Sequence, residues 1–259
     1  MYQPPQFNSK DRVQALDIIR AHPFASLISM DDTGLPFVTH LPLHLEEHPS
    51  TGSGRTGLEG GRTDVGLTLF GHCAKRNAHW KYLKERPQAV VTFLGPNAYL
   101  SPQIYPDLAR VPSWNYVAVH CTVQATLIEE PEAKDRLLKK LIGDHEPAYK
   151  QQWIDLGVEF QHKMLGGIVG FELQVLDLQC KIKINQHRPE SHAALHEMYA
   201  AGNDDERALA DWMVKLGLVN EHNLPDDFVR ELLAAKAEPR ENMAIYVSSQ
   251  TREKTKLKP

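Results

Sequence analysis

The sequence predicts a mainly antiparallel β fold with a few inserted helices. Apolar and polar residues alternate along the clearest of several candidate strands, a pattern typical of a strand with one face in a core. The candidate helices fall between strands without alternating regularly with them, which favours an antiparallel barrel over a parallel sheet. The chain has 259 residues, of which 42% are hydrophobic, so it can bury a sizeable core.

The predicted strands begin near the N-terminus. Residues 24–30 and 36–43 flank the turn sequence DDTG, which predicts a β-hairpin. Four further strands are expected at 65–71, 89–95, 116–129 and 166–179. Along 116–129 the odd positions from Val117 to Leu127 are apolar and most even positions are polar, so one face of this strand should lie in the core.

Helices are expected at 77–85, 131–143 and 147–156. After Pro189 the pattern changes to two amphipathic segments, 205–217 and 225–237, followed by the basic tail TREKTKLKP. We therefore divide the chain into a domain at 1–186 and a helical C-terminal extension with a basic tail at 187–259. The glycine-rich segment 50–66 is expected to be a loop.

Composition narrows the functional classes. A formal charge of −4 and a pI near 6.3 give no overall attraction to nucleic acid or anionic membranes. No apolar run approaches the length of a membrane span, and the start MYQPPQFNSKDRV lacks the layout of a signal peptide. Cys73, Cys121 and Cys180 are widely spaced and odd in number, which indicates reduced thiols. These features predict a cytoplasmic protein with no membrane partner.

Two motif-like stretches, and one motif that is absent, give no functional prediction. GSGRTG (52–57) fits the dinucleotide pattern G-x-G-x-x-G but lacks a strand before it and a helix after it. His40, His44 and His48 recur every four residues, yet Pro42 argues against one helix, so no metal site is expected. No G-x-S-x-G elbow occurs and no cysteine stands in a nucleophile context, so catalytic residues stay unknown.

The stretch GHCAKRNAHW (71–80) predicts an anion site. A strand is expected to turn into a helix here, and the first turn of a helix has unpaired N–H groups and a partial positive charge. Lys75, Arg76, Asn77 and His79 around such a turn suit a phosphate, and Trp80 is placed to flank a planar ligand. The alternative is a solvated basic turn.

Two Pro-rich stretches, GPNAYLSPQIY (95–105) and VPSWNY (111–116), carry a second group of candidate residues. Aromatic side chains on rigid connections suit stacking on a flat ring. The alternative is a loop cluster that covers one end of a barrel. The candidates in these stretches are Ser101, Tyr105, Trp114, Asn115 and Tyr116.

Together with MYQPPQF, HPFASLIS, GLPFVTHLPL and the closing GGIVGFELQV and KIKINQ, these stretches resemble the PaiB-type FMN-binding negative transcriptional regulators over residues 1–190. The resemblance implies an FMN-binding split β-barrel related to the pyridoxamine-phosphate oxidase group. It also implies a homodimer that binds FMN in a groove between its subunits.

The resemblance places the FMN phosphate at Lys75, Arg76, Asn77 and His79, with His72 and Trp80 alongside, and the isoalloxazine ring near Thr39, His40 and Leu41. The resemblance also implies that the groove is closed by the second subunit, through the residues of 99–116 named above, or by Lys183 and Gln186. The chain departs from the family pattern at Ala78, Ile104 and Ser113, where the family usually has Pro, Trp and Thr. Its closing motif, Lys183 to His187, also differs from the usual K-x-S-Q-N.

Three functions follow from the resemblance and the fold class. The first is a negative transcriptional regulator that binds FMN, with promoter DNA as a candidate partner, although no helix-turn-helix pair with a basic second helix is found. The second is a flavin-dependent oxidoreductase that uses NAD(P)H. The third is a haem-binding split barrel, in which His72 or His79 would be the axial ligand.

Overall fold

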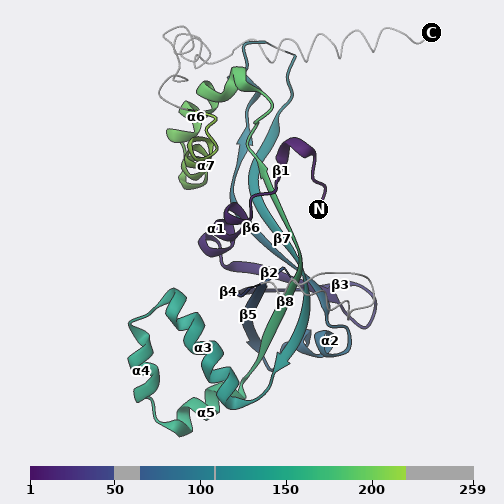
Figure 1. Ribbon diagram of the computed structural model, residues 1–259, viewed down its shortest axis with the longest axis vertical. Coiled ribbons are helices and arrows are strands. Elements are labelled where there is room, and N and C mark those ends of the chain that lie inside the picture. Colours follow the sequence, from purple (N-terminus) through teal and green to yellow (C-terminus); the bar gives the residue numbers. More distant parts are fainter. Residues whose placement is uncertain (50–64, 108, 220–259) are drawn as a thin grey trace, which may run out of the picture. The chain divides into compact units, whose positions relative to one another are not determined.

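The computed structural model describes residues 1–49, 65–107 and 109–219 (Figure 1). These residues form two compact units. The first contains the described residues of 1–97 and 115–184, and the second contains those of 98–114 and 185–219. Of the sequence predictions, the loop residues 50–64, the helix at 225–237 and the basic tail at 251–259 lie outside the described residues.

Eight strands make one sheet in the described chain, in the order β3-β2-β6-β7-β8-β5-β4, with β1 paired to β8. Every strand pair whose register is given is antiparallel, which confirms the predicted fold class. The strands are β1 (Asn8–Ser9), β2 (Phe24–Met30), β3 (Pro36–Pro42), β4 (His44–Glu47), β5 (Leu67–Ala74), β6 (Gln88–Leu100), β7 (Ser113–Ile128) and β8 (Ile168–Lys183).

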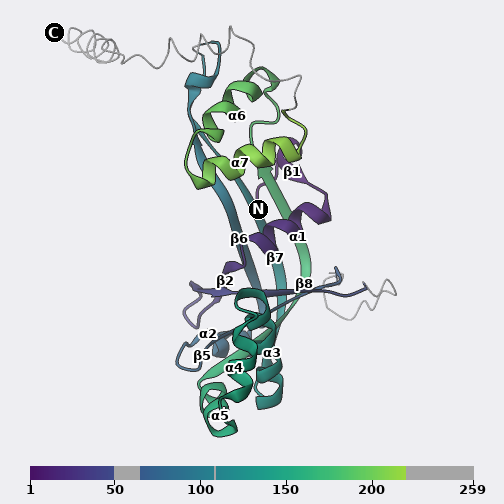
Figure 2. The same cartoon turned by 90° about the vertical axis from the view of Figure 1, so that its left-hand side faces the viewer.

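Helices lie between or after the strands. In the first unit α3, α4 and α5 form a helical insertion between β7 and β8, and in the second unit α6 and α7 lie side by side (Figures 1 and 2). None of the helices in the described ranges is long and apolar enough to cross a membrane. The helices are α1 (Arg12–Ala21), α2 (His79–Glu85), α3 (Pro131–His145), α4 (Tyr149–Asp155), α5 (Val158–Gly166), α6 (His192–Ala200) and α7 (Asp204–Lys215).

The hairpin predicted at DDTG joins β2 to β3. The Asp31 carboxylate accepts hydrogen bonds from the backbone N–H groups of Thr33 (2.8 Å) and Leu35 (3.0 Å) and from the Thr33 hydroxyl (2.7 Å). These bonds, the Thr33 hydroxyl first, lower the pKa of Asp31. Gly34 has a φ of +82°, which an L side chain rarely adopts. This turn fixes the register that sets Thr39 opposite Leu27 and His40 opposite Ser26.

The alternation predicted along β7 is confirmed by burial. Val117, Val119, Cys121, Val123 and Ala125 are all buried, whereas Leu127 at the end of the strand is half-buried. This alternation shows that one face of β7 packs in the core, as expected for an antiparallel sheet with one solvated side.

Two strand ends differ from the predictions. The strand expected to stop at Gly71 continues to Ala74, because residues 71–74 pair with residues 168–171 of β8. A Cβ on Gly71 would lie 2.5 Å from Leu43 Cδ2. Glycine at this position therefore allows the backbone of β5 to pack closely against the Leu43 side chain. The strand expected at 89–95 runs on to Leu100, so part of the predicted Pro-rich connection is strand.

All three cysteines of the chain are free and buried within strands. Burial raises the pKa of the Cys73 and Cys180 thiols to about 11 and that of Cys121 to about 12. Each thiol is therefore protonated and shielded near neutral pH, a state in which cysteine is a poor nucleophile.

Gly95 on β6 provides a test of the packing between β6 and β7. A Cβ at this position would lie 2.5 Å from Val117 Cγ2, and Val117 is fully buried and stiff about χ1. We expect Gly95→Ala to lower the free energy of unfolding by about 1–3 kcal/mol through overpacking. Urea denaturation would measure this loss, with Gly143→Ala, which has open space around it, as the matched control. Equal stability of both variants would contradict the described packing.

Candidate functional site

Three of the predicted site residues meet where β3 faces the turn between β5 and α2. The Thr39 hydroxyl oxygen lies 3.0 Å from Asn77 Nδ2 and 2.7 Å from His79 Nδ1. Thr39 is half-buried on β3, Asn77 lies in the turn, and His79 is the first residue of α2. Residues 38 to 40 positions apart in the sequence thus form one hydrogen-bonded group, which we call the Thr39 cluster.

The turn itself is held by local hydrogen bonds. Asn77 Oδ1 accepts the backbone N–H of His79 at 3.0 Å, and Trp80 Nε1 donates to the Lys75 carbonyl at 2.9 Å. The Lys75 N–H donates to the carbonyl of Gly167 at 2.8 Å, which fastens the turn to the start of β8. Asparagine at this position satisfies a first-turn N–H that the helix leaves unpaired.

Lys75 and Arg76 project from this turn into solvent. Helix α2 has only seven residues and no side-chain cap on its N-terminus, so the two side-chain cations, rather than the helix dipole, supply the positive charge here. An ammonium and a guanidinium on adjacent residues suit a phosphate group.

His79 is the most enclosed member of the cluster. Its side chain is 0% exposed, and its ring packs edge-on against Phe37 with centroids 5.1 Å apart. Burial lowers the pKa of His79 to about 4, so the imidazole is neutral at pH 7. Its Nε2 atom has no hydrogen-bond partner within the described residues. A buried polar atom without a partner is rare and points to a structural or ligand-linked role.

The other two predicted residues of β3, Leu41 and His40, lie on opposite faces of the strand. Leu41 is 3% exposed and shares the inner face of β3 with Thr39. His40 points to the outer face, where its Nδ1 lies 3.0 Å from the Ser26 hydroxyl and its ring stacks near Phe24. The sequence analysis missed Ser26, although the hairpin register pairs it with His40.

The outer face of β3, β2 and β6 is apolar and uncovered in the single chain. Phe24 is 67% exposed, Leu94 60% and Val38 45%. The register aligns Ile28 with Val38 on one side and with Val90 on the other, so these side chains share one surface. We call the following set the outer apolar face: Phe24, Ile28, Met30, Val38, Val90 and Leu94.

The other predicted site residues of the first unit are not part of the Thr39 cluster. His72 is half-buried on β5, burial lowers its pKa, and its Nδ1 has no partner in the described chain. Asn115 is fully buried. Tyr116 lies opposite Lys183 in the β7–β8 register, and its ring faces Lys181 at 5.3 Å. Burial first, and the charge of Lys181 second, lower the pKa of Lys183.

Four predicted residues belong to the second unit. Ser101 accepts a hydrogen bond from the Gln103 N–H and so caps the short helix at Pro102–Ile104. Tyr105 is 5% exposed and donates to Asn185 Oδ1 at 3.1 Å, so its ring is part of this unit's interior. Trp114 is exposed and packs edge-on against Tyr99. Gln186 follows Asn185 after the end of β8.

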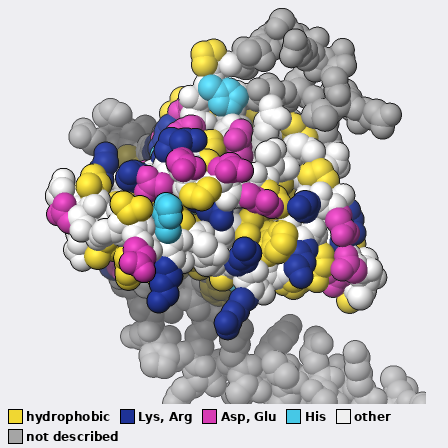
Figure 3. All heavy atoms as spheres, turned by 90° about the horizontal axis from the view of Figure 1, so that it is seen from below, with side chains coloured by type: hydrophobic (Ala, Val, Ile, Leu, Met, Phe, Trp, Pro, Cys, Tyr) yellow, Lys and Arg dark blue, Asp and Glu magenta, His cyan; other side chains and the backbone are white. Residues whose placement is uncertain are grey.

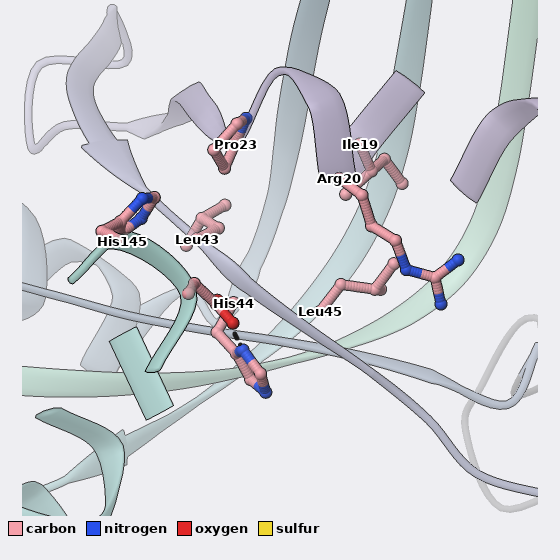
Figure 4. A pocket seen from close by; sticks show the side chains of 8 residues that line it. Ile19, Arg20, Pro23, Leu43, His44, Leu45 and His145 are labelled. Carbon is pink, nitrogen blue, oxygen red and sulfur yellow. Dashed lines mark hydrogen bonds and ion pairs between the residues drawn. The ribbon is translucent and has the colours of Figure 1, made fainter. Parts of the chain in front are cut away.

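A separate pocket of about 260 Å³ lies at the ends of α1 and α3 and contains none of the predicted residues (Figure 4). His44 Nδ1 lies 2.6 Å from Asp144 Oδ2 at its edge. Its volume is below the range of about 300–1,000 Å³ typical of cofactor pockets. No local sequence pattern indicates this pocket, because His44 and Asp144 are 100 positions apart. Its lining is Ile19, Arg20, Pro23, Leu43, His44, Leu45, Asp144 and His145.

Within the described ranges, no three or more His, Cys, Asp or Glu side chains are grouped so as to hold a metal ion. The three histidines at four-residue spacing have separate partners: His40 contacts Ser26, His44 contacts Asp144, and His48 Nε2 lies 3.0 Å from the Thr68 hydroxyl.

Comparison with known proteins identifies the family. A family model described as "Putative FMN-binding domain" matches residues 1–177. Protease synthase and sporulation protein PAI 2 of Bacillus subtilis is 27% identical over 220 residues, which cover 82% of this chain and 96% of that protein.

Among solved structures, the flavocytochrome Anf3 from Azotobacter vinelandii matches with 18% identity and a TM-score of 0.49 over 68% of this chain and 69% of that chain. The FAD and heme binding protein from Mycobacterium smegmatis matches with 16% identity and a TM-score of 0.45 over 68% and 73%. Because the family model covers well over half of the chain, the protein belongs to this FMN-binding domain family, whose cofactor is FMN.

Proposed function

We propose that this protein is a homodimer that binds FMN at the Thr39 cluster and acts as a negative regulator of transcription. The observation that carries the FMN site is the meeting of Thr39, Asn77 and His79 beside the exposed cations Lys75 and Arg76. The donor set fits FMN, because two cations suit its phosphate and a hydroxyl suits an oxygen or nitrogen of the flavin. When bound, FMN supplies redox chemistry that no side chain provides.

The outer apolar face supports a second copy of the chain as the partner. This face includes the outer side of the β2–β3 hairpin that carries Thr39 and His40, together with Val90 and Leu94 of β6. Large contiguous apolar patches with scattered polar groups are typical of protein–protein contacts. Pairing through this face would set a partner subunit beside β3, as the family resemblance implies. The three reduced cysteines agree with a cytoplasmic location for the assembly.

The dimer is tested by a charge on the most exposed residue that β6 contributes to the outer apolar face. We expect wild-type protein to elute with the mass of two chains, and Leu94→Glu to shift it to the mass of one, because an unpaired carboxylate would be buried in the contact. Light scattering on a size-exclusion column measures both masses. Val158→Glu on α5, where Val158 is 68% exposed, is the matched control. A wild-type monomer at micromolar concentration would overturn the dimer.

The FMN site is tested by titrating purified protein with FMN and following quenching of flavin fluorescence. Saturable binding with one FMN per chain supports the proposal, and no quenching with excess FMN overturns it. Because the outer apolar face adjoins the hairpin, Leu94→Glu should also weaken FMN binding if the groove lies between subunits.

The regulatory part is supported by the family resemblance, and it is tested with DNA. Binding to promoter fragments should exceed binding to random sequence and should weaken as salt rises. Equal affinity for promoter fragments and random sequence at low salt would contradict the proposed regulatory role. The face seen in Figure 3 carries Lys and Arg interspersed with Asp and Glu, so it does not form a uniform basic surface.

One observation counts against DNA recognition by α6 and α7 and so keeps a flavin-dependent oxidoreductase as the second candidate. Helices α6 and α7 are joined by a short turn that contains Gly202, as in some DNA-binding helix pairs, yet α7 is acidic. A second helix with more carboxylates than cations is repelled by phosphate. Its charged residues are Asp204, Asp205, Glu206, Arg207, Asp211 and Lys215. Oxidation of NAD(P)H faster than by free FMN would favour this candidate.

Haem binding has less support from the geometry. His79 is fully buried and its Nδ1 already contacts Thr39, so it has no surface open to an iron. A Soret band in the purified protein would reverse this conclusion.

A further inference from the structure

The orientation of the Asn77 amide follows from its two contacts. Its Oδ1 lies 3.0 Å from the backbone N–H of His79, which is only a donor, so this atom must be the amide oxygen. The amide nitrogen therefore faces Thr39 and donates to its hydroxyl oxygen at 3.0 Å. One of the two lone pairs of the Thr39 oxygen is thus occupied.

The tautomer of His79 decides what the second lone pair does. If the proton were on Nε2, a buried N–H would have no partner among the described residues. Orphaned buried N–H groups are rarer than under-satisfied acceptors. The proton is therefore assigned to Nδ1, which donates to the Thr39 oxygen across 2.7 Å. The low pKa of His79 leaves the ring with one proton at neutral pH, in agreement with this assignment.

Because both lone pairs of the Thr39 oxygen accept hydrogen bonds, the Thr39 hydroxyl can make one more hydrogen bond, in which it donates its own proton. We propose that His79 and Asn77 are positioning residues that hold Thr39 as a hydrogen-bond donor to an acceptor atom of FMN. The opposite tautomer would leave Thr39 an acceptor, suited to the N3–H of the flavin. This inference rests on the proposed FMN site, and it assigns His79 an indirect role in place of the direct cofactor contact expected from the sequence.

The first test compares variants of Thr39 by FMN fluorescence titration. Thr39→Val, which keeps the shape but has no hydroxyl, should bind FMN about 10-fold more weakly, as expected for one lost hydrogen bond of about 1.4 kcal/mol. Thr39→Ser should bind within about 3-fold of wild type. The visible spectrum of bound FMN should shift between wild type and Thr39→Val, because a donor to the flavin changes its electronic environment.

The second test asks whether His79 acts through Thr39. His79→Asn can place an amide nitrogen near the position of Nδ1 and should largely retain affinity, whereas His79→Leu should weaken binding as much as Thr39→Val. The double variant Thr39→Val/His79→Leu should be no weaker than either single variant. Additive losses would show that His79 acts independently and would overturn the inference.

The acceptor atom is located by changing the ligand. Riboflavin lacks the phosphate and 5-deaza-FMN has a C–H in place of N5. If the difference between wild type and Thr39→Val persists with riboflavin, the acceptor lies on the ring or the ribityl chain, and if it disappears the acceptor is the phosphate. If wild type binds all three flavins but Thr39→Val binds each equally well, the inference fails while the FMN site stands. If wild type binds none of them, the proposed function itself fails.

Discussion

Replacing Lys75 and Arg76 together by alanine is expected to weaken FMN binding by about 2–4 kcal/mol. Each cation would lose a charge-assisted hydrogen bond to the phosphate, and such bonds contribute more than neutral ones. Both side chains are exposed on the turn before α2, so their loss leaves the core untouched. Fluorescence titration with FMN measures the effect, and riboflavin, which has no phosphate, should show almost none.

The matched control removes two other exposed cations from the same region. Lys81→Ala/Lys84→Ala changes the net charge by the same amount but alters side chains further along α2. If this control weakens FMN binding as strongly as the Lys75 and Arg76 variant does, the effect is general electrostatic attraction and not a phosphate site. Undiminished FMN affinity in the Lys75 and Arg76 variant would move the phosphate elsewhere.

Acid should destabilise this protein through His79. Its pKa is about 4 in the folded chain and about 6.5 in an unfolded one. The unfolded state therefore binds more protons between these pH values, and the free energy of unfolding falls as the pH is lowered from 6.5 to 4. At 1.36 kcal/mol per pKa unit, His79 alone accounts for a loss of about 3 kcal/mol, complete below pH 4.

The contribution of His79 to this loss of stability is measured by comparing wild type with a variant that lacks the imidazole. Urea denaturation at pH 7 and at pH 4.5 gives the pH effect for wild type and for His79→Asn, which cannot titrate. His72 and His120, whose pKa values are also lowered by burial, contribute equally to both proteins and cancel. The variant should lose clearly less stability than wild type on acidification. His162→Asn, at an exposed site on α5, should behave as wild type.

The strands were predictable because period-two alternation is a local signal. Segment 24–30 was predicted to the residue, and the turn at Asp31 to Gly34 fixed its partner. The stretch from Lys75 to His79 was recognisable for its chemistry. Its contact with Thr39 depends on how β3 folds back over β5 and α2, which no local pattern specifies.

Helices α1, α5 and α6 were not predicted. For α1 the signal was present, since Asp11 caps Val13 and four apolar residues follow at helical spacing. Helix α5 exposes Val158, Phe160 and Met164, so its sequence lacks a clean amphipathic pattern. The strand predicted over 36–43 ends at Pro42, which pairs with Phe24, and the separate strand β4 begins at His44.

The three buried cysteines limit how this protein can react with oxidants. Peroxide and disulfide reagents act on thiolates, and here each of the three cysteine sulfurs is kept as S–H inside a strand. A thiol-based response of the folded protein to an oxidant is therefore disfavoured, whereas a bound flavin changes colour with its electron count. A colour change on reduction is then expected of the FMN-loaded protein and not of the empty one.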